Sequence, residues 1–325
     1  MKNRVLVAMA NDRFIDQAKQ LFASAYWNAG WDGDYLLLGY EFSEDDGRWF
    51  RDKGIEVLPI HNVLEGDYPL GERITCCKPY MFKEYFMKWR NVVYLDVDII
   101  IRAPFHELGT VKGFHACPSL GQTVRDNFID FDKIEEGMKD RIERTLDLGK
   151  KSFNAGVMAF STDIITDAMF DDCVACIKEY IDVSRFGGDQ LAMNLFFPDW
   201  KELPPVYNFT LPLDYPVNPN KIDAIITHLV SFGDGPWNPN SPFRPEWLEI
   251  LAKAEQLDLA NIPHPEPWSQ ERINQASRAL IKKHLLHGQE VSVGSIGNML
   301  KRIAHLALTN PKKLIAKTKH LFLNA

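Results

Sequence analysis

The stretch Asn91-Val92-Val93-Tyr94-Leu95-Asp96-Val97-Asp98-Ile99-Ile100-Ile101 places two carboxylates inside a run of β-branched and aromatic residues. Such a run predicts a buried central strand, in which an ionised carboxylate is costly unless it is paired or bound to a cation. Since side chains alternate along a strand, Asp96 and Asp98 would share one face, with Val97 on the other. Two carboxylates on one face could bind a single metal ion, and oxygen ligands favour Mg²⁺ or Mn²⁺ over zinc.

The composition is that of a folded protein with a substantial core. The chain has 325 residues, of which 46% are hydrophobic and 25% charged, enough for one large or two modest globular units. Its start, MKNRVLVAMANDRF, enters a strand-like run without a signal-peptide cleavage pattern, which predicts a cytoplasmic protein. The five cysteines show no paired metal-type spacing, and Cys173 and Cys176 lie in a helical pattern, so reduced, packed thiols are expected.

Strand-like and helix-like segments alternate along the chain, which predicts an α/β fold with a mixed, mostly parallel sheet flanked by helices. A helix is expected to lead directly into the aspartate run, which would itself be one strand. The other expected strands are residues 4–10, 35–39, 55–58, about 113–116 and 153–161, and the expected helices are residues 15–27, 79–89 and 133–148.

The C-terminal part differs from the rest in composition. Three prolines within residues 261–268 exclude a helix interior and predict a linker between a domain at 1–260 and a helical extension at 269–325. This extension carries ten Lys or Arg against two acids, alternating with Leu, Ile and Phe. The pattern suits helices lying on the inner, anionic face of a membrane, and equally a solvated appendage. The acidic body argues against a nucleic-acid partner.

Several polar residues end apolar runs, where ligands of open α/β sheets bind. Ala10 and Asn11 close the first strand, and a metal held by two carboxylates predicts a nucleotide or diphosphate ligand nearby. His228 ends another apolar run and could be a hydrogen-bonded structural residue or a neutral metal ligand. Asn154 could be a turn residue or could point its amide into a binding cleft. Asp189 could be the N-terminal cap of a helix or a functional residue.

Five segments resemble the consecutive motifs of the family 8 glycosyltransferases: VVYLDVDIII, SFNAGVMAFS, GGDQLAMNLFF, DWKELPPVYNF and HLVSFGDGPW. They occur in the family's order and separation, and the resemblance covers about residues 5–237. It implies a GT-A fold, dependence on Mn²⁺, a UDP-sugar donor and retention of the anomeric configuration.

By position, the resemblance also implies individual roles. Asp96 and Asp98 match the metal-binding aspartates, and His228 matches the third protein ligand of the ion. Asn11 falls where the family often has an aspartate that contacts the uracil edge, and an amide can donate as well as accept there. Phe14 matches an aromatic residue that stacks on the base.

On the sugar side, the resemblance places Asn154 in the sugar pocket and Asp189 and Gln190 closest to the anomeric carbon. Lys78 matches a basic residue near the donor sugar and the phosphates. The remaining residues of the implied nucleotide-sugar site are Ala10, Val97, Gly233 and Gly235.

One position departs from the family pattern. The family usually has a lysine before the Pro-Trp pair, where this chain has Gly235, and that lysine would contact the diphosphate leaving group. Arg244 and Lys221 are the nearby basic residues that could replace it.

The sequence therefore predicts a metal-dependent retaining glycosyltransferase that moves a hexose or N-acetylhexosamine from a UDP-sugar to a glycan or lipid-linked acceptor. Retention would use either a covalent intermediate on Asp189 or attack on the same face as the leaving group, which is favoured. Gln190 could instead stabilise the oxocarbenium-like state through its amide oxygen. The alternatives are a sugar-nucleotide nucleotidyltransferase and a catalytically weak UDP-sugar-binding or scaffold protein.

Overall fold

The computed structural model describes residues 2–129, 131–210, 218–230 and 235–282. The chain divides into two units, residues 1–280 and 281–325. The predictions for Gly233 and for most of the basic C-terminal extension lie outside the described residues.

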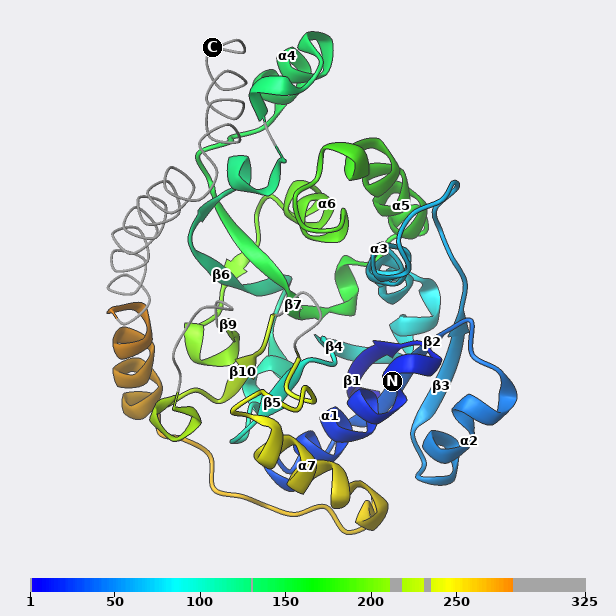
Figure 1. Cartoon of the computed structure of the whole chain (residues 1–325), viewed down its shortest axis with the longest axis vertical. Coiled ribbons are helices and arrows are strands. Elements are labelled where there is room, and N and C mark those ends of the chain that lie inside the picture. Colours follow the sequence, from blue (N-terminus) through cyan, green and yellow to red (C-terminus); the bar gives the residue numbers. More distant parts are fainter. Residues whose placement is uncertain (1, 130, 211–217, 231–234, 283–325) are drawn as a thin grey trace, which may run out of the picture. The chain divides into compact units, whose positions relative to one another are not determined.

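A seven-stranded sheet forms the centre of the first unit, in the order β3-β2-β1-β4-β7-β6-β8 (Figure 1). The four strands β3, β2, β1 and β4 are parallel, whereas β7 pairs antiparallel with both β4 and β6. The predicted mixed, mostly parallel sheet is thus confirmed. The strands are β1 (Lys2–Ala10), β2 (Asp34–Tyr40), β3 (Glu56–Ile60), β4 (Trp89–Leu95), β6 (Phe114–Thr123), β7 (Lys151–Ser161) and β8 (Lys201–Glu202).

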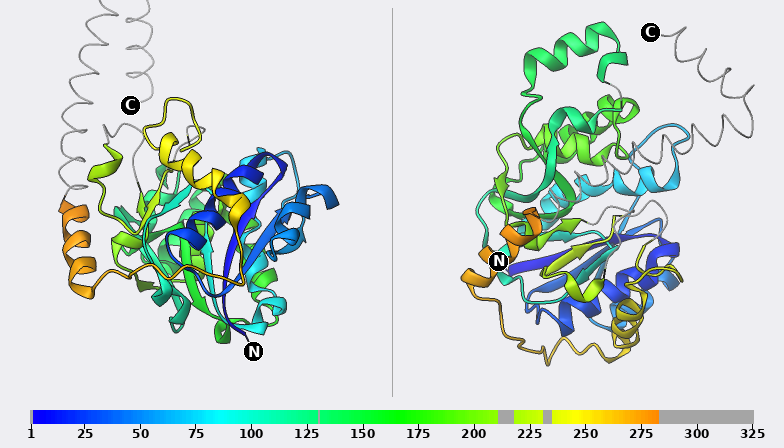
Figure 2. Two further views of the ribbon diagram at one scale, coloured as in Figure 1. Left: turned by 90° about the horizontal axis from the view of Figure 1, so that it is seen from below. Right: turned by 60° about the vertical axis from the view of Figure 1, so that its left-hand side comes forward.

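Helices cover both faces of this sheet, and the side chains of β1 point alternately to the helices on either face. Leu6 and Ala8 pack in one core cluster with side chains of α1 and α7, which lie side by side (Figures 1 and 2). Val5 and Val7 point to the other cluster, which includes side chains of α5 and α6. The helices are α1 (Ile15–Trp27), α2 (Glu44–Asp52), α3 (Leu70–Thr75), α4 (Glu136–Thr145), α5 (Met169–Tyr180), α6 (Asp189–Phe196) and α7 (Arg244–Ala252).

A second, three-stranded sheet corrects the prediction for the aspartate run. It has the order β5-β10-β9, with β5 at Ile99–Ile101, β9 at Phe209–Thr210 and β10 at Ile226–His228. Strand β4 ends at Leu95 and β5 begins at Ile99, so the prediction that both aspartates lie inside one strand is wrong.

The two aspartates instead form the crossing between the sheets. The Asp96 amide donates to Gly156 O of β7 (2.9 Å), whereas Asp98 O accepts from Leu229 N beyond β10 (3.0 Å). The backbone of Asp96 thus bonds to the seven-stranded sheet and that of Asp98 to the segment after β10 of the three-stranded sheet. Both carboxylates therefore lie between two strands rather than inside one.

The prediction of a single helix at residues 79–89 is also wrong. The chain makes two 3-10 helices, η2 (Lys78–Phe82) and η3 (Glu84–Lys88), separated at Lys83, whose backbone is extended. The extended residue places the Lys83 ammonium over the rings of Tyr80 and Phe170, at 4.7 and 4.2 Å from their centroids. The other predicted helices and strands are confirmed, with shifted ends.

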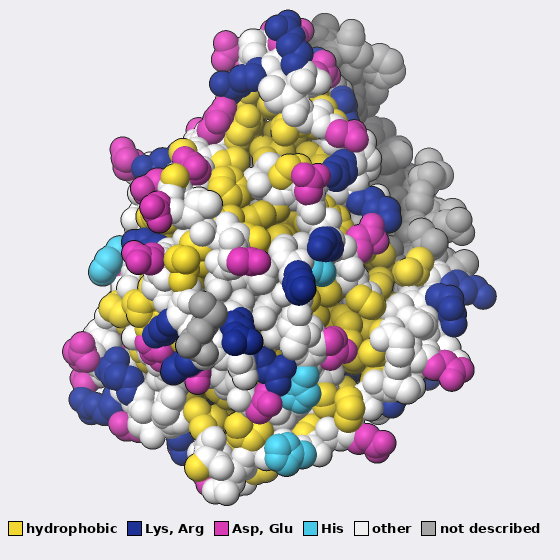
Figure 3. Space-filling model, turned by 180° about the vertical axis from the view of Figure 1, so that it is seen from behind, with side chains coloured by type: hydrophobic (Ala, Val, Ile, Leu, Met, Phe, Trp, Pro, Cys, Tyr) yellow, Lys and Arg dark blue, Asp and Glu magenta, His cyan; other side chains and the backbone are white. Residues whose placement is uncertain are grey.

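The surface mixes charges of both signs. On the face turned away in Figure 1, basic and acidic side chains alternate with hydrophobic ones (Figure 3). Exposed pairs such as Lys178 with Glu65 (2.8 Å) each contribute little to stability, because solvent screens them. Within the described part of the chain, no helix has both the length and the apolar character needed to cross a bilayer.

Candidate metal and nucleotide-sugar site

Three potential metal ligands meet where the two sheets join. Asp96 and Asp98 occupy the turn between β4 and β5, and His228 ends β10, which pairs antiparallel with β5. Their ligand atoms all lie within 4.8 Å of one another. His228 Nε2 is 3.0 Å from Asp98 Oδ1 and 3.9 Å from Asp96 Oδ2. The structure thus brings together the three residues predicted as ligands.

The spacing of these atoms fits a shared cation. Asp98 Oδ1 is buried and has no aligned hydrogen-bond donor among the described residues, although His228 Nε2 lies so near. Adjacent ligands of an octahedral ion with bonds of about 2.1 Å lie about 3.0 Å apart. Burial disfavours a charged imidazole, but the Asp98 and Asp96 carboxylates outweigh it and raise the pKa of His228. The same negative field would attract a divalent ion.

Gly156 of β7 forms one wall of this cluster. A Cβ built on it would lie 2.1 Å from His228 Cε1 and 2.8 Å from Asp96 Oδ2, so a methyl group would displace the ligands. We expect Gly156→Ala to lower the affinity for a divalent metal about 10- to 100-fold, the usual range when ligands lose their orientation. Calorimetric titration with MnCl2 measures this, and Gly71→Ala, with nothing within 4 Å of its added Cβ, is the control. Equal affinity in both variants would contradict the expectation.

Lys78 links the metal cluster to α6. The side chain is only 2% exposed, and its ammonium lies 2.8 Å from Asp189 Oδ2, 3.2 Å from Asp96 Oδ1 and 3.0 Å from Ala155 O. These contacts occupy its three N–H groups. Burial alone would lower the pKa of Lys78, but the two carboxylates reverse this and raise it. The buried cation therefore holds both carboxylates in place.

Asp189 is the first residue of α6 but does not cap it. The cap position is Gly188, whose φ of 87° follows Gly187 at 72°, a left-handed pair that glycine adopts readily. The Asp189 carboxylate is 5% exposed and turns to Lys78 instead. The positive end of α6 also favours a carboxylate at this position.

Buried and half-buried amides surround the cluster, and two of them were not predicted from the sequence. Asn154 of β7 hydrogen bonds to Gln190 of α6 (3.1 Å) and to Asn208 (2.9 Å), and Gln190 bonds to Asn127 (2.7 Å). Asn208 lies within the DWKELPPVYNF motif and could have been found there, whereas Asn127 belongs to none of the five motifs. The amides predicted for the sugar pocket thus belong to a larger polar group.

The residues predicted for the base lie beyond the end of β1. Asn11 Oδ1 accepts from Arg13 N (3.1 Å) and so caps the 3-10 helix η1 (Asp12–Phe14), which commits one of its lone pairs. Phe14 makes an edge contact with Trp237, with ring centroids 6.0 Å apart. Of the remaining predicted residues, Ala10 is buried in the core and Val97 is partly buried against it.

Gly235, which stands where the resemblance leads one to expect a lysine, lies against the ring of Trp237. A Cβ at Gly235 would lie 2.3 Å from the Trp237 ring, so a larger residue would push away the tryptophan that contacts Phe14. Of the two basic residues considered as replacements, Lys221 is exposed, and Arg244 has a buried Nε without a hydrogen-bond partner among the described residues.

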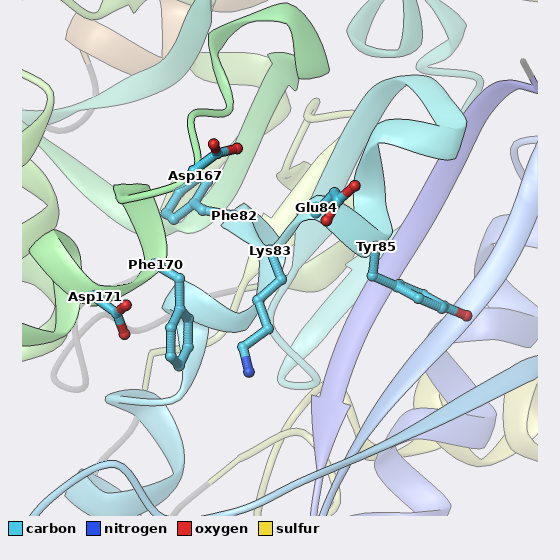
Figure 4. A pocket seen from close by; sticks show the side chains of 7 residues that line it. All are labelled: Phe82, Lys83, Glu84, Tyr85, Asp167, Phe170 and Asp171. Atoms are coloured by element: carbon cyan, nitrogen blue, oxygen red, sulfur yellow. The ribbon is translucent and has the colours of Figure 1, made fainter.

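A separate pocket contains none of the predicted site residues. Its walls combine acidic and aromatic side chains with one lysine, which extends beside the Phe170 ring (Figure 4). The lining residues are Phe82, Lys83, Glu84, Tyr85, Asp167, Phe170 and Asp171.

The cysteines are free thiols, as predicted. Burial is the main reason that the pKa values of Cys77 and Cys176 rise to about 12. These groups are therefore protonated and unreactive at neutral pH.

Residues 72–240, more than half of the chain, match the model of glycosyl transferase family 8. The chain belongs to this glycosyltransferase family. The matched range contains Lys78, both metal-site aspartates, Asp189 and His228, whereas Asn11 and Phe14 precede it. No curated protein sequence matches the chain.

Solved structures of glycosyltransferases share the fold. The galactosyltransferase LgtC, in complex with donor and acceptor sugar analogues, has 19% identity and a TM-score of 0.56 over 80% of this chain and 98% of its own. GlyE of Streptococcus pneumoniae TIGR4 has 17% identity and a TM-score of 0.54 over 82% and 67%. The bifunctional enzyme WbbM has 15% identity and a TM-score of 0.55 over 79% of this chain, which spans only 52% of WbbM. The GT-A fold is thereby confirmed.

Proposed function

We propose that this glycosyltransferase moves a hexose or N-acetylhexosamine from a UDP-sugar to a glycan or lipid-linked acceptor, with Mn²⁺ held by Asp96, Asp98 and His228. The main support for this proposal is that these three potential ligands and the buried Lys78–Asp189 ion pair lie together in one polar cluster. The LgtC structure, which contains donor and acceptor sugar analogues, supports a sugar donor and a sugar acceptor here.

The proposed roles follow from the chemistry of each group. A bound Mn²⁺ would act as a Lewis acid on the diphosphate and stabilise its charge as it leaves. Asn11 and Phe14 would contact the uracil base, since an amide and an aromatic ring suit its edge and face. Asn154 and Gln190, fixed by their mutual hydrogen bond of 3.1 Å, would orient the sugar hydroxyl groups.

For retention, we propose attack on the same face as the leaving group rather than a covalent intermediate. Asp189 is the carboxylate that would have to act as nucleophile, but it is buried and bound to the Lys78 ammonium at 2.8 Å. A paired, desolvated carboxylate donates electrons less readily than a free one. In the favoured route the acceptor oxygen bonds to the anomeric carbon as the bond to the diphosphate breaks, and the acceptor proton passes to a phosphate oxygen.

A donor screen tests the proposal most directly. The purified chain is incubated with individual UDP-sugars and MnCl2, with and without EDTA, and UDP release is measured. We expect release from at least one UDP-hexose or UDP-N-acetylhexosamine that EDTA abolishes, and NMR of the first sugar product should show the donor's anomeric configuration. Tight UDP binding by calorimetry without turnover on any donor would instead support a binding or scaffold protein.

We also propose that the basic C-terminal extension brings the enzyme to a membrane-bound acceptor. Because Ile273, Ala276 and Leu280 are buried in the main core, charge changes are safer than a deletion from residue 269. The full chain with Lys301, Arg302, Lys312 and Lys313 changed to Gln should lose co-sedimentation with vesicles containing anionic lipid, since each basic residue adds about 1 kcal/mol of attraction. Unchanged sedimentation would rule out this role.

A further inference from the structure

A continuous chain of side-chain hydrogen bonds runs from the sugar-pocket amides to the metal cluster. Gln190 Nε2 donates to Asn127 Oδ1 (2.7 Å), and Asn154 Nδ2 donates to Gln190 Oε1 (3.1 Å). Asn208 Nδ2 donates to Asn154 Oδ1 (2.9 Å), and Asn208 Oδ1 lies 3.0 Å from His228 Nδ1. We call Asn127, Gln190, Asn154 and Asn208 the amide chain. Where an amide has two neighbours in it, its oxygen faces one and its NH2 group the other.

A backbone group fixes the direction of the chain beside the histidine. The Gly156 N–H, which can only donate, points at one terminal atom of the Asn154 amide from 2.9 Å, so that atom must be the oxygen. The Asn208 atom that faces the same oxygen must then be its NH2 group. Since the other end of Asn208 is therefore a carbonyl oxygen, His228 Nδ1 must carry a proton in order to donate to it.

The opposite end of the amide chain gives the same direction independently. Asn127 Nδ2 faces the carbonyl oxygens of Thr123 and Val124, at 3.1 and 3.4 Å, which can only accept. The other atom of Asn127 is then the oxygen, so Gln190 presents its NH2 group to Asn127 and its oxygen to Asn154. Two backbone anchors at different points thus agree, and no amide can be reversed without opposing like groups.

We propose that Asn208 is a positioning residue that holds His228 in the Nδ1–H tautomer, so that Nε2 presents its lone pair to the ion held by Asp96 and Asp98. This inference rests on the proposed metal site, where Nε2 is the histidine atom nearest to both carboxylates. A metal-bound imidazole needs its other nitrogen to donate a hydrogen bond, because that bond fixes both the tautomer and the ring orientation. Asn208 is 5% exposed, so water cannot readily take over its role.

The amide chain also joins two parts of the proposed site. Asn154 bonds to both Asn208 and Gln190, so a sugar that reorients the Asn154 amide would disturb the His228 contact. The arrangement favours a single configuration of all four amides before the donor binds, which lowers the cost of ordering them in the reaction.

The test compares substitutions of Asn208 in the full chain. Leucine has a similar volume but no polar atoms. Aspartate still accepts a hydrogen bond from Nδ1–H, although its second oxygen then faces Asn154 Oδ1 in place of the Asn208 NH2 group. We expect Asn208→Leu to lower the affinity for Mn²⁺ about 10- to 100-fold in calorimetry with MnCl2 alone, and Asn208→Asp to lower it less. Asn91→Leu, which removes a buried amide bonded to Val111 O (2.7 Å), is the matched control and should bind like the wild type.

The tautomer itself is measured with saturating Mg²⁺, a diamagnetic ion, in place of Mn²⁺, because in the metal-free protein the Asp98 carboxylate 3.0 Å from Nε2 would also attract the proton. In ¹⁵N-histidine-labelled protein above the pKa of His228, imidazole ¹⁵N shifts distinguish Nδ1–H from Nε2–H, and His228→Gln identifies the signal among the nine histidines. We expect Nδ1–H in the wild type and in Asn208→Asp, and a mixture in Asn208→Leu. A wild-type Nε2–H tautomer, or a folded Asn208→Leu variant with unchanged tautomer and metal affinity, would overturn the proposal. Absence of Mn²⁺ binding to the wild type with Nδ1–H present would refute the metal site but not the tautomer assignment.

Discussion

Changing Asp98 to asparagine is expected to reduce sugar transfer by at least about a hundredfold while leaving the protein folded. The substitution removes one negative charge from the metal cluster and keeps the size of the side chain. Asp98 Oδ1 lies 3.0 Å from His228 Nε2, and an asparagine oxygen can keep that contact, so we expect the fold to survive the loss of charge. The rate of UDP release with a competent donor measures the loss, and circular dichroism checks the fold.

Asp98 is a cleaner target than Asp96. The Asp96 carboxylate also accepts from Tyr94 OH (2.6 Å) and pairs with Lys78, so its replacement would disturb stability as well as metal binding. The control is Asp34→Asn, because Asp34 begins β2 and bonds to Trp89 Nε1 (2.6 Å) without any contact to the cluster. If Asp98→Asn turned over within a few-fold of Asp34→Asn, the metal site would not be where catalysis occurs.

The sequence was sufficient to predict the main strands and the composition of the metal cluster. Strand β1 alternates between two core clusters, and such local hydrophobic patterns need no knowledge of distant residues. Asp96, Asp98 and His228 could be grouped because ordered motifs carried the long-range information that periodicity lacks.

Long-range partners set the features that the sequence did not reveal. The end of β4 at Leu95 depends on where β10 pairs with β5, some 130 positions later in the chain. The strand-like run continues past Leu95 to Ile101, interrupted only by the two aspartates. The ion pairs of Lys78 with Asp96 and Asp189 could not be predicted, because both acidic partners are distant from it in sequence. Asn127 joins the amide chain from a loop-like segment whose composition indicates nothing about Gln190.

Changing Lys78 to methionine is expected to lower the free energy of unfolding by about 3 to 5 kcal/mol, because it leaves the buried partner carboxylates without their cation. Methionine fills a similar volume, so the loss reports charge pairing rather than packing. Denaturant unfolding of the metal-free protein measures it. The control is Lys88→Met, whose ammonium pairs with Glu56 at the same 2.8 Å as Lys78 with Asp189, but whose side chain is 36% exposed. That variant should lose no more than about 1 kcal/mol.

A second substitution separates the contributions of the two carboxylates. In Lys78→Met with Asp189→Asn, the most buried unpaired charge is removed, so part of the lost stability should return and the two changes should not be additive. The stability that does not return should reflect the unpaired charge of Asp96, which a bound divalent ion would also neutralise. MnCl2 should therefore raise the free energy of unfolding more in Lys78→Met than in the wild type. Equal effects of Lys78→Met and Lys88→Met would show that the buried ammonium does not hold these carboxylates.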